Sequence, residues 1–219
     1  MKIHDPLKTS CAGSAKLRLI VILAAALAAA VGLYLGVRVT APAEPVNPQM
    51  LQNALLFPQP RELPAFALDA GDGSVLDAAA LKGRWSLVFV GFTHCPDICP
   101  TTLATLGGLQ KALADFKPAL QIVFVSVDPE RDSAAKASEY ARYFVADALA
   151  ATADHARLEP FTRSLGMIYM QSPLEGGDYT VDHSSSIAIL DPQARLVGVF
   201  RPPFEIARMA ADLRQLAGN

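Results

Sequence analysis

The sequence is short of cysteine and, beyond its first 43 residues, short of positive charge. Only three of its 219 residues are cysteines, and residues 44–219 hold 20 acidic but 14 basic side chains. An acidic domain repels the phosphate backbone of DNA and RNA, which argues against nucleic-acid binding. The sequence contains no internal repeat, and its length suits one ordinary domain with an appendage.

Charge is also absent from one long stretch near the N-terminus. No charged residue interrupts the chain from Leu19 to Val37, a length that spans roughly 30 Å as a helix. A buried core helix would show a polar face, which this stretch lacks, and the apolar core of a signal peptide is shorter. Although residues 40–43 offer a cleavage site, we expect residues 19–37 to form an uncleaved transmembrane anchor.

The flanks of this stretch predict its orientation. Only Arg38 follows it closely, whereas four basic residues precede it, namely Lys2, Lys8, Lys16 and Arg18. The positive-inside rule places residues 1–18 in the cytoplasm and the rest of the chain across the membrane. A short lead that contains Asp5 does not resemble an Arg-rich mitochondrial presequence. We therefore expect a single-pass protein of the bacterial inner membrane with its C-terminal domain in the periplasm.

The remainder of the sequence divides into a tether and one domain. Residues 38–61 are rich in proline and predict an extended tether. Within residues 62–219, apolar runs predict buried strands at 87–90, 122–127, 186–190 and 196–200, and helical spacing predicts helices at 101–116, 133–144, 158–165 and 204–216. This order predicts an α/β fold, a thioredoxin-like mixed sheet with helices on both faces. Residues 171–185, with Gly176 and Gly177, are expected to form a mobile loop.

Two of the cysteines lie where a strand is predicted to give way to a helix. Cys95 and Cys99 form a C-x₃-C pair, and the unpaired N–H groups at a helix start stabilise thiolates. The spacing brings two sulfurs to one face of a helical turn, where they can form a disulfide, a redox couple or a metal clamp. A purely stabilising disulfide is disfavoured because so short a loop constrains the unfolded chain little. Cys11 precedes the apolar stretch and is interpreted as an idle thiol.

Three motifs in order carry a family resemblance. Residues 92–103 read FTHCPDICPTTL, residues 125–132 read VSVDPERD, and residues 181–185 read VDHSS. Together they resemble the Sco/SenC family of cytochrome c oxidase assembly proteins. The resemblance implies a thioredoxin fold that binds one copper ion per chain through Cys95, Cys99 and His183. The ligand types agree with this, because soft thiolates select Cu(I) and imidazole also suits Cu(II).

The resemblance also implies the functional hypotheses. The leading one is a membrane-anchored copper chaperone that delivers copper to the copper A subunit of cytochrome c oxidase, supplied by a periplasmic copper donor. Its alternative is a reductase in which Cys95 and Cys99 are the redox pair, recharged by a thiol reductant. A third hypothesis, which the resemblance does not imply, is a peroxiredoxin-like peroxidase, although its activated cysteine would have only His94 as a nearby basic partner. The C-x₃-C spacing and the absence of proline from 175 to 190 favour copper binding over thioredoxin-type redox chemistry.

Three further residues lie in or near the motifs. Asp97 and Asp128 are candidates for supporting the site or docking a partner. His94 adjoins Cys95 and competes with His183 as the third ligand. Because successive residues of a strand point to opposite faces, a residue directly before Cys95 is expected to aim away from the sulfurs. We therefore expect the distant His183 to join the cysteines.

Overall fold

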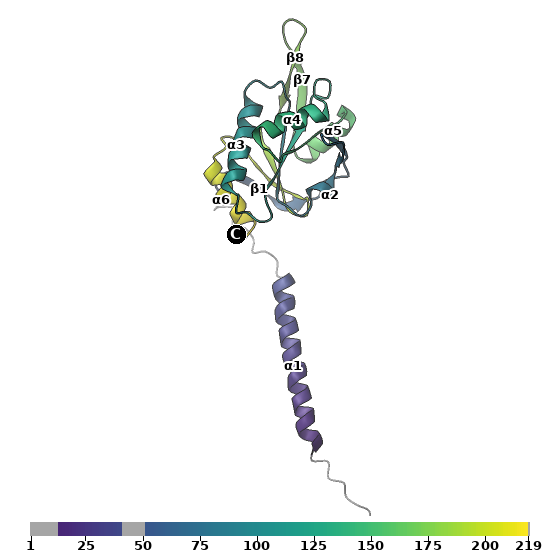
Figure 1. Ribbon diagram of the computed structural model, residues 1–219, viewed down its shortest axis with the longest axis vertical. Coiled ribbons are helices and arrows are strands. Elements are labelled where there is room, and N and C mark those ends of the chain that lie inside the picture. The colour runs from purple at the N-terminus through teal and green to yellow at the C-terminus, as the bar shows by residue number, and fades with distance from the viewer. Residues whose placement is uncertain (1–12, 41–50, 219) are drawn as a thin grey trace, which may run out of the picture. The chain divides into compact units, whose positions relative to one another are not determined.

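The computed structural model of the chain describes residues 13–40 and 51–218 and divides into two units (Figure 1). The N-terminal unit contains one helix, α1 (Gly13–Thr40). Its stretch from Leu17 to Tyr34 is fully exposed and, by length and composition, suffices to cross a membrane, with a mean hydropathy of 2.3. The lead at 1–12, with Cys11, and the tether segment 41–50, with most of the cleavage site, lie outside the described residues.

The second unit is built on an eight-stranded sheet with the order β1-β10-β9-β4-β5-β6-β2-β3. The strands of this sheet are β1 (Ala54–Arg61), β2 (Leu68–Ala70), β3 (Val75–Leu76), β4 (Ser86–Gly91), β5 (Gln121–Ser126), β6 (Leu149–Thr152), β9 (Ile187–Leu190) and β10 (Leu196–Phe200). The helices are α2 (Ala78–Leu81), α3 (Ile98–Ala112), α4 (Ala134–Phe144), α5 (His155–Ser164) and α6 (Ile206–Leu216). A separate hairpin pairs β7 (Tyr169–Pro173) with β8 (Tyr179–His183).

The centre of the sheet is parallel and its flanks are antiparallel. β4 pairs in parallel with β5, and β5 with β6, whereas β9 runs antiparallel to β4. Every residue of β4 and β5 is buried, as expected for continuous apolar strands that are covered on both faces. Helix α3 contacts both α4 and α6 (Figure 1). The expected mixed α/β sheet is confirmed, and each expected strand and helix is present with ends that differ by a few residues.

The folded unit begins earlier than the sequence predicted. Residues 54–61, assigned to the tether, form β1, which pairs antiparallel with β10 at the edge of the sheet. The Asp212 carboxylate on α6 is buried and accepts hydrogen bonds from the backbone N–H groups of Gln52, Asn53 and Ala54, at 2.7–2.8 Å. The domain therefore begins before residue 62, the boundary expected from the sequence, because residue 62 directly follows β1.

The segment 171–185 also differs from its prediction as a mobile loop. Most of it belongs to the β7–β8 hairpin, in which Tyr169 pairs with His183 and Pro173 with Tyr179. Gly176 and Gly177 occupy the turn at the tip, where both adopt positive φ angles that only glycine accepts readily. His183 lies at the opposite end of β8, so the hairpin places a histidine beside the main sheet.

Candidate metal centre

The two cysteines flank the point at which α3 begins. β4 ends at Gly91, a turn follows, and α3 begins at Ile98 with Asp97 as its N-cap. Cys99 lies in the first turn of the helix, whereas Cys95 lies in the preceding turn, where its N–H donates to the Phe92 carbonyl. Both cysteines were expected on one helical turn, but only Cys99 is helical. The Cys99 N–H donates to the Cys95 sulfur at 3.4 Å, so a free N–H of the helix start faces a thiol.

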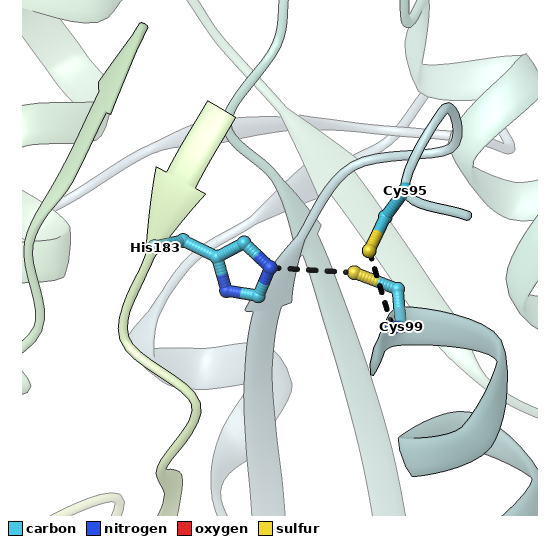
Figure 2. A group of neighbouring side chains, drawn as sticks. All are labelled: Cys95, Cys99 and His183. Atoms are coloured by element: carbon cyan, nitrogen blue, oxygen red, sulfur yellow. Dashed lines mark hydrogen bonds between the residues drawn. The ribbon is translucent and has the colours of Figure 1, made fainter. Parts of the chain in front are cut away.

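His183 approaches these sulfurs from the hairpin (Figure 2). Its Nε2 atom lies 3.4 Å from the Cys99 sulfur, and its Nδ1 atom lies 3.1 Å from the Ser184 carbonyl oxygen. Because a carbonyl oxygen only accepts, Nδ1 carries the proton and the Nε2 lone pair faces the sulfur. The two sulfurs and one ring nitrogen all lie within 4.8 Å of one another.

Burial dominates the electrostatics of this group. It raises the pKa of the fully buried Cys99 thiol well above its ordinary range, although a backbone hydrogen bond from Phe92 acts in the opposite direction. It also lowers the pKa of His183, so the imidazole is neutral and free to bind a metal. The rings of Phe89 and Phe92 lie edge-on to His183 at centroid distances of 5.9 and 6.0 Å.

A glycine makes room for the buried sulfur. A Cβ atom built on Gly91 would lie 2.6 Å from the Cys99 sulfur and 3.1 Å from the Phe124 ring. Real Cβ atoms do not approach other atoms to 2.6 Å, so a side chain at this position would displace the sulfur. The strand therefore passes beneath Cys99 only because residue 91 is glycine.

His94, the other histidine considered from the sequence, points elsewhere. Its side chain is exposed, and its Nδ1 atom lies 3.7 Å from a carboxylate oxygen of Asp132. With Asp128 and Asp132 it forms a second group of possible ligand atoms within 4.8 Å, separate from the cysteines. The structure thus brings together Cys95, Cys99 and His183, and places His94 beside Asp132 in a separate group.

The two aspartates proposed as supporting residues have different surroundings. Asp97 is exposed, and its carboxylate lies at 3.5 Å from the Thr101 hydroxyl, which donates to it. Asp128 is fully buried and accepts hydrogen bonds from Arg131 Nε and the Tyr179 hydroxyl, each at 2.6 Å. Since Tyr179 begins the strand that His183 ends, Asp128 fixes the hairpin that carries the histidine.

Asp132 also belongs to the site, although the sequence analysis did not single it out. Its buried carboxylate accepts the Thr93 N–H and the Ser126 hydroxyl, both at 2.7 Å, and lies 3.4 Å from the Lys136 ammonium. It thereby holds the turn before Cys95 against the end of β5. The available signal was the third acidic residue of the 125–132 motif, which follows a buried strand.

These side chains fit a soft metal ion. Two sulfurs and a neutral imidazole nitrogen converge, and thiolate and imidazole ligands both suit copper. The Nδ1–H hydrogen bond to a backbone carbonyl fixes the ring orientation, as the outer partners of metal-bound histidines do.

The fold and this site define the chain as a thioredoxin-like protein with a cysteine pair at a helix start and a histidine brought to it by a hairpin. It belongs to the SCO1/SenC family, whose model matches residues 58–218. A Stutzerimonas stutzeri protein whose name attributes copper binding to it is 34% identical over 168 residues, covering 76% of this chain and 82% of that protein.

Mitochondrial and plant proteins are similar as well. The bovine mitochondrial SCO2 homolog is 36% identical over 157 residues, which covers 67% of this chain but 58% of that longer protein. The crystal structure of Arabidopsis thaliana ScoI with copper bound superposes with a TM-score of 0.67 at 28% identity, covering 71% of this chain and 98% of that one. The fold and the family predicted from the sequence are thus confirmed, and copper is present in a solved relative.

Proposed function

We propose that this protein binds one copper ion between Cys95, Cys99 and His183 and delivers it to the copper A site during cytochrome c oxidase assembly. The observation that carries the proposal is the convergence of two thiols and a neutral imidazole within 4.8 Å. Membership of a family described as cytochrome c oxidase assembly proteins supports the destination. Copper is here the cargo of the protein.

The ligand set suits a carrier that takes up both oxidation states. Each thiol loses its proton as it binds, and two thiolates hold Cu(I) without further help. His183 adds the nitrogen that Cu(II) favours. Since the histidine comes from the hairpin and the sulfurs come from the α3 start, the ligands can separate one element at a time when a recipient takes the metal.

The different exposure of the two cysteines supports one side from which a recipient reaches the metal. Cys99 is fully buried, whereas Cys95 is half-buried in the turn and next to the exposed Pro96 and Asp97. A recipient's ligands therefore reach the metal from the Cys95 side, and Asp97 is placed to contact that partner. The copper donor approaches by the same face.

The chain's N-terminal part fits a membrane anchor. The Leu17–Tyr34 stretch of α1 is apolar and exposed, and basic residues are concentrated before it. We propose a single span of the bacterial inner membrane, with residues 1–18 in the cytoplasm and the copper-binding domain in the periplasm.

Paired histidine variants test the ligand assignment. His183→Ala should lose most Cu(II) binding while keeping Cu(I) on the two sulfurs, because only the nitrogen ligand is removed. His94→Ala is the matched control and should keep one copper per chain. Metal content and the absorption spectrum of the Cu(II) form measure both. An unchanged spectrum in His183→Ala together with a lost one in His94→Ala would overturn the assignment.

A second candidate function is thiol–disulfide exchange. The sulfurs of Cys95 and Cys99 lie within 4.8 Å, so a small rotation allows a disulfide between them. In that role the pair gives two electrons and two protons to a recipient disulfide, and a thiol reductant later restores it. Alkylation of the reduced protein distinguishes the roles, because copper should protect both thiols if they are ligands. Equal labelling with and without copper would favour the redox role alone.

A further inference from the structure

One face of the β7–β8 hairpin, here called its outer face, exposes large apolar side chains. Ile168 and Met170 are 71% and 65% exposed, and Leu174 just beyond β7 is 51% exposed. The Ile168 carbonyl accepts the Ser184 N–H, so Ile168 extends the ladder, and side chains two positions apart point to the same face. No charged residue occurs from 168 to 174. Neighbouring exposed side chains of this kind mark an interaction site.

The opposite face of the hairpin is already in use. The Tyr169 hydroxyl lies 2.8 Å from His155 Nδ1, and the Gln171 amide donates to Glu130 at 3.1 Å. Val181, on the same face, is buried. Within the described part of the chain the hairpin pairs with no further strand, and it projects from the second unit (Figure 1). The outer face is therefore the side of the hairpin that is open to another molecule.

The outer face reaches the metal centre. Ile168 and Met170 line one open pocket together with His183, the expected nitrogen ligand. Tyr169, which lies between the two apolar residues, pairs with His183 across the hairpin. A molecule seated in this pocket therefore lies against the element that carries the histidine.

The charge of the hairpin indicates the kind of partner. Residues 169–183 hold no lysine or arginine and three acidic residues, which are Glu175, Asp178 and Asp182. Met170 pairs with Asp182 across the ladder, so apolar and acidic side chains lie next to each other. Arg163 also lines the pocket, but Glu159 pairs with it at 3.6 Å. Such a surface attracts a protein segment that is apolar and basic, and an anionic lipid surface would be repelled.

We propose that the outer face of the hairpin docks the copper A subunit of cytochrome c oxidase, through a segment that combines an apolar side chain with lysine or arginine. This inference deepens the proposed function and rests on it. The apolar side chain fills the pocket at Ile168 and Met170, and the basic residues meet Asp182. The partner then holds the element that carries His183, so the histidine can leave the metal while the recipient's ligands enter from the Cys95 side.

Met170→Lys tests the docking surface, with the full chain in detergent and the metal-free copper A subunit as the probe. The lysine repels basic groups of the partner, whereas its position opposite Asp182 keeps the hairpin stable. The variant should keep one copper per chain and its Cu(II) spectrum. Its dissociation constant for the subunit, measured by titration calorimetry, should rise roughly tenfold or more. The matched control is Val75→Lys, since Val75 is 54% exposed, lies outside the pocket and also pairs with an aspartate, Asp69.

Salt provides a second readout of the same titration. Opposite charges at the rim of an interface are screened by ions, so added salt should weaken the binding of the wild type and of Val75→Lys. Binding that does not change with salt would contradict a basic partner.

Copper transfer separates this inference from the proposed function. If the wild type transfers copper to the subunit and Met170→Lys binds and transfers equally well, the inference fails and the proposed function stands. If the wild type transfers none, the proposed delivery fails and the titration alone decides: binding that only Met170→Lys loses supports the surface, and no binding overturns it. Unchanged affinity for the subunit with lost self-association or lost binding to lipid vesicles would identify another occupant and overturn the inference.

Discussion

Gly91 is the residue on which the position of the buried cysteine depends. It ends the central strand directly beneath the Cys99 sulfur, and its missing side chain leaves the space that the sulfur fills. Metal ligands need positions accurate to a fraction of an ångström. A methyl group on residue 91 is therefore expected to displace the Cys99 sulfur and disturb metal binding even where the overall fold is kept.

Gly91→Ala should weaken copper binding and destabilise the domain by about 1–3 kcal/mol, the usual cost of overpacking a core. The control is Gly108→Ala on α3, whose added Cβ meets only the flexible end of the Ile206 side chain. That variant should bind copper normally and be as stable as the wild type or up to about 1 kcal/mol more stable. Urea unfolding and metal content measure both effects, and normal binding in Gly91→Ala would contradict the argument.

The raised pKa of Cys99 predicts how the metal-free protein responds to alkali. The folded state holds the thiol proton more tightly than the unfolded chain, whose cysteines have a pKa of about 8.5. This thiol therefore contributes stability below that pH and loses it above, by up to about 1.4 kcal/mol per pH unit. Urea unfolding of the reduced protein between roughly pH 7.5 and 9.5 measures the slope.

Cys99→Ala removes the titrating group and should flatten that slope. Cys11→Ala serves as the control, since it removes a thiol from the N-terminal unit and should leave the slope unchanged. Identical slopes in Cys99→Ala and the wild type would show that another group governs the alkaline loss.

The sequence predicts some residues of the site but not others. Cys95, Cys99 and His183 lie in motifs. His94 is apart from the sulfurs as expected, but it lies in the turn after β4, which ends at Gly91, so strand alternation is not the reason. Cys95 lies in the turn before α3 and not on the helix as expected, because α3 begins only at Ile98. The part of Asp132 was missed, because its carboxylate meets the Thr93 N–H and the Ser126 hydroxyl only once the turn before Cys95 lies against the end of β5.

At the scale of elements, the β7–β8 hairpin matters because it delivers the histidine. Asp128 binds the hydroxyl of Tyr179, the first residue of β8, while Arg131 binds the Tyr179 carbonyl at 2.9 Å and stacks on the Tyr179 ring. These contacts tie the hairpin to the loop after β5. The position of His183 thus depends on a carboxylate that belongs to another element.

Asp128→Asn should loosen the hairpin and weaken the nitrogen coordination of Cu(II), while the two sulfurs still hold Cu(I). The buried charge that Arg131 pairs with is lost, and charged hydrogen bonds contribute more than neutral ones. Hydrogen exchange of the hairpin amides should become faster. Asp178→Asn is the control, because this side chain also contacts Arg131 but is 72% exposed and should change neither property. Equal exchange rates in both variants would contradict this role.

Two elements escaped prediction for physical reasons. Pro58 and Pro60 argued against a strand at 54–61, yet β1 lies at the sheet edge, where a proline need not donate to a neighbour. The hairpin strands are half-exposed and pair only with each other, so they lack the continuous apolar run that revealed β4 and β5. The sequence pattern therefore predicted the buried parallel strands, but it did not predict the edge strand β1 or the exposed hairpin strands.

At the scale of the whole molecule, the two ends of the chain carry charges of opposite sign. The first 43 residues are basic and the remainder is acidic, which predicts opposite sides of a membrane for the two ends. A reporter enzyme that is active only in the periplasm should work when fused after Asn219. A reporter that works only in the cytoplasm is the control and should be silent there. Activity of the cytoplasmic reporter would overturn the orientation.

The Asp212 contact with residues 52–54 determines where a pulling force enters the domain. Tension from the N-terminal side arrives at this carboxylate and at the β1–β10 ladder, whose hydrogen bonds resist shear together. β10 and β9 separate β1 from β4, the strand that leads to the cysteines. If α1 anchors the chain as proposed, movements of the anchor load one edge of the sheet, and the ligands are expected to keep their spacing two strands away.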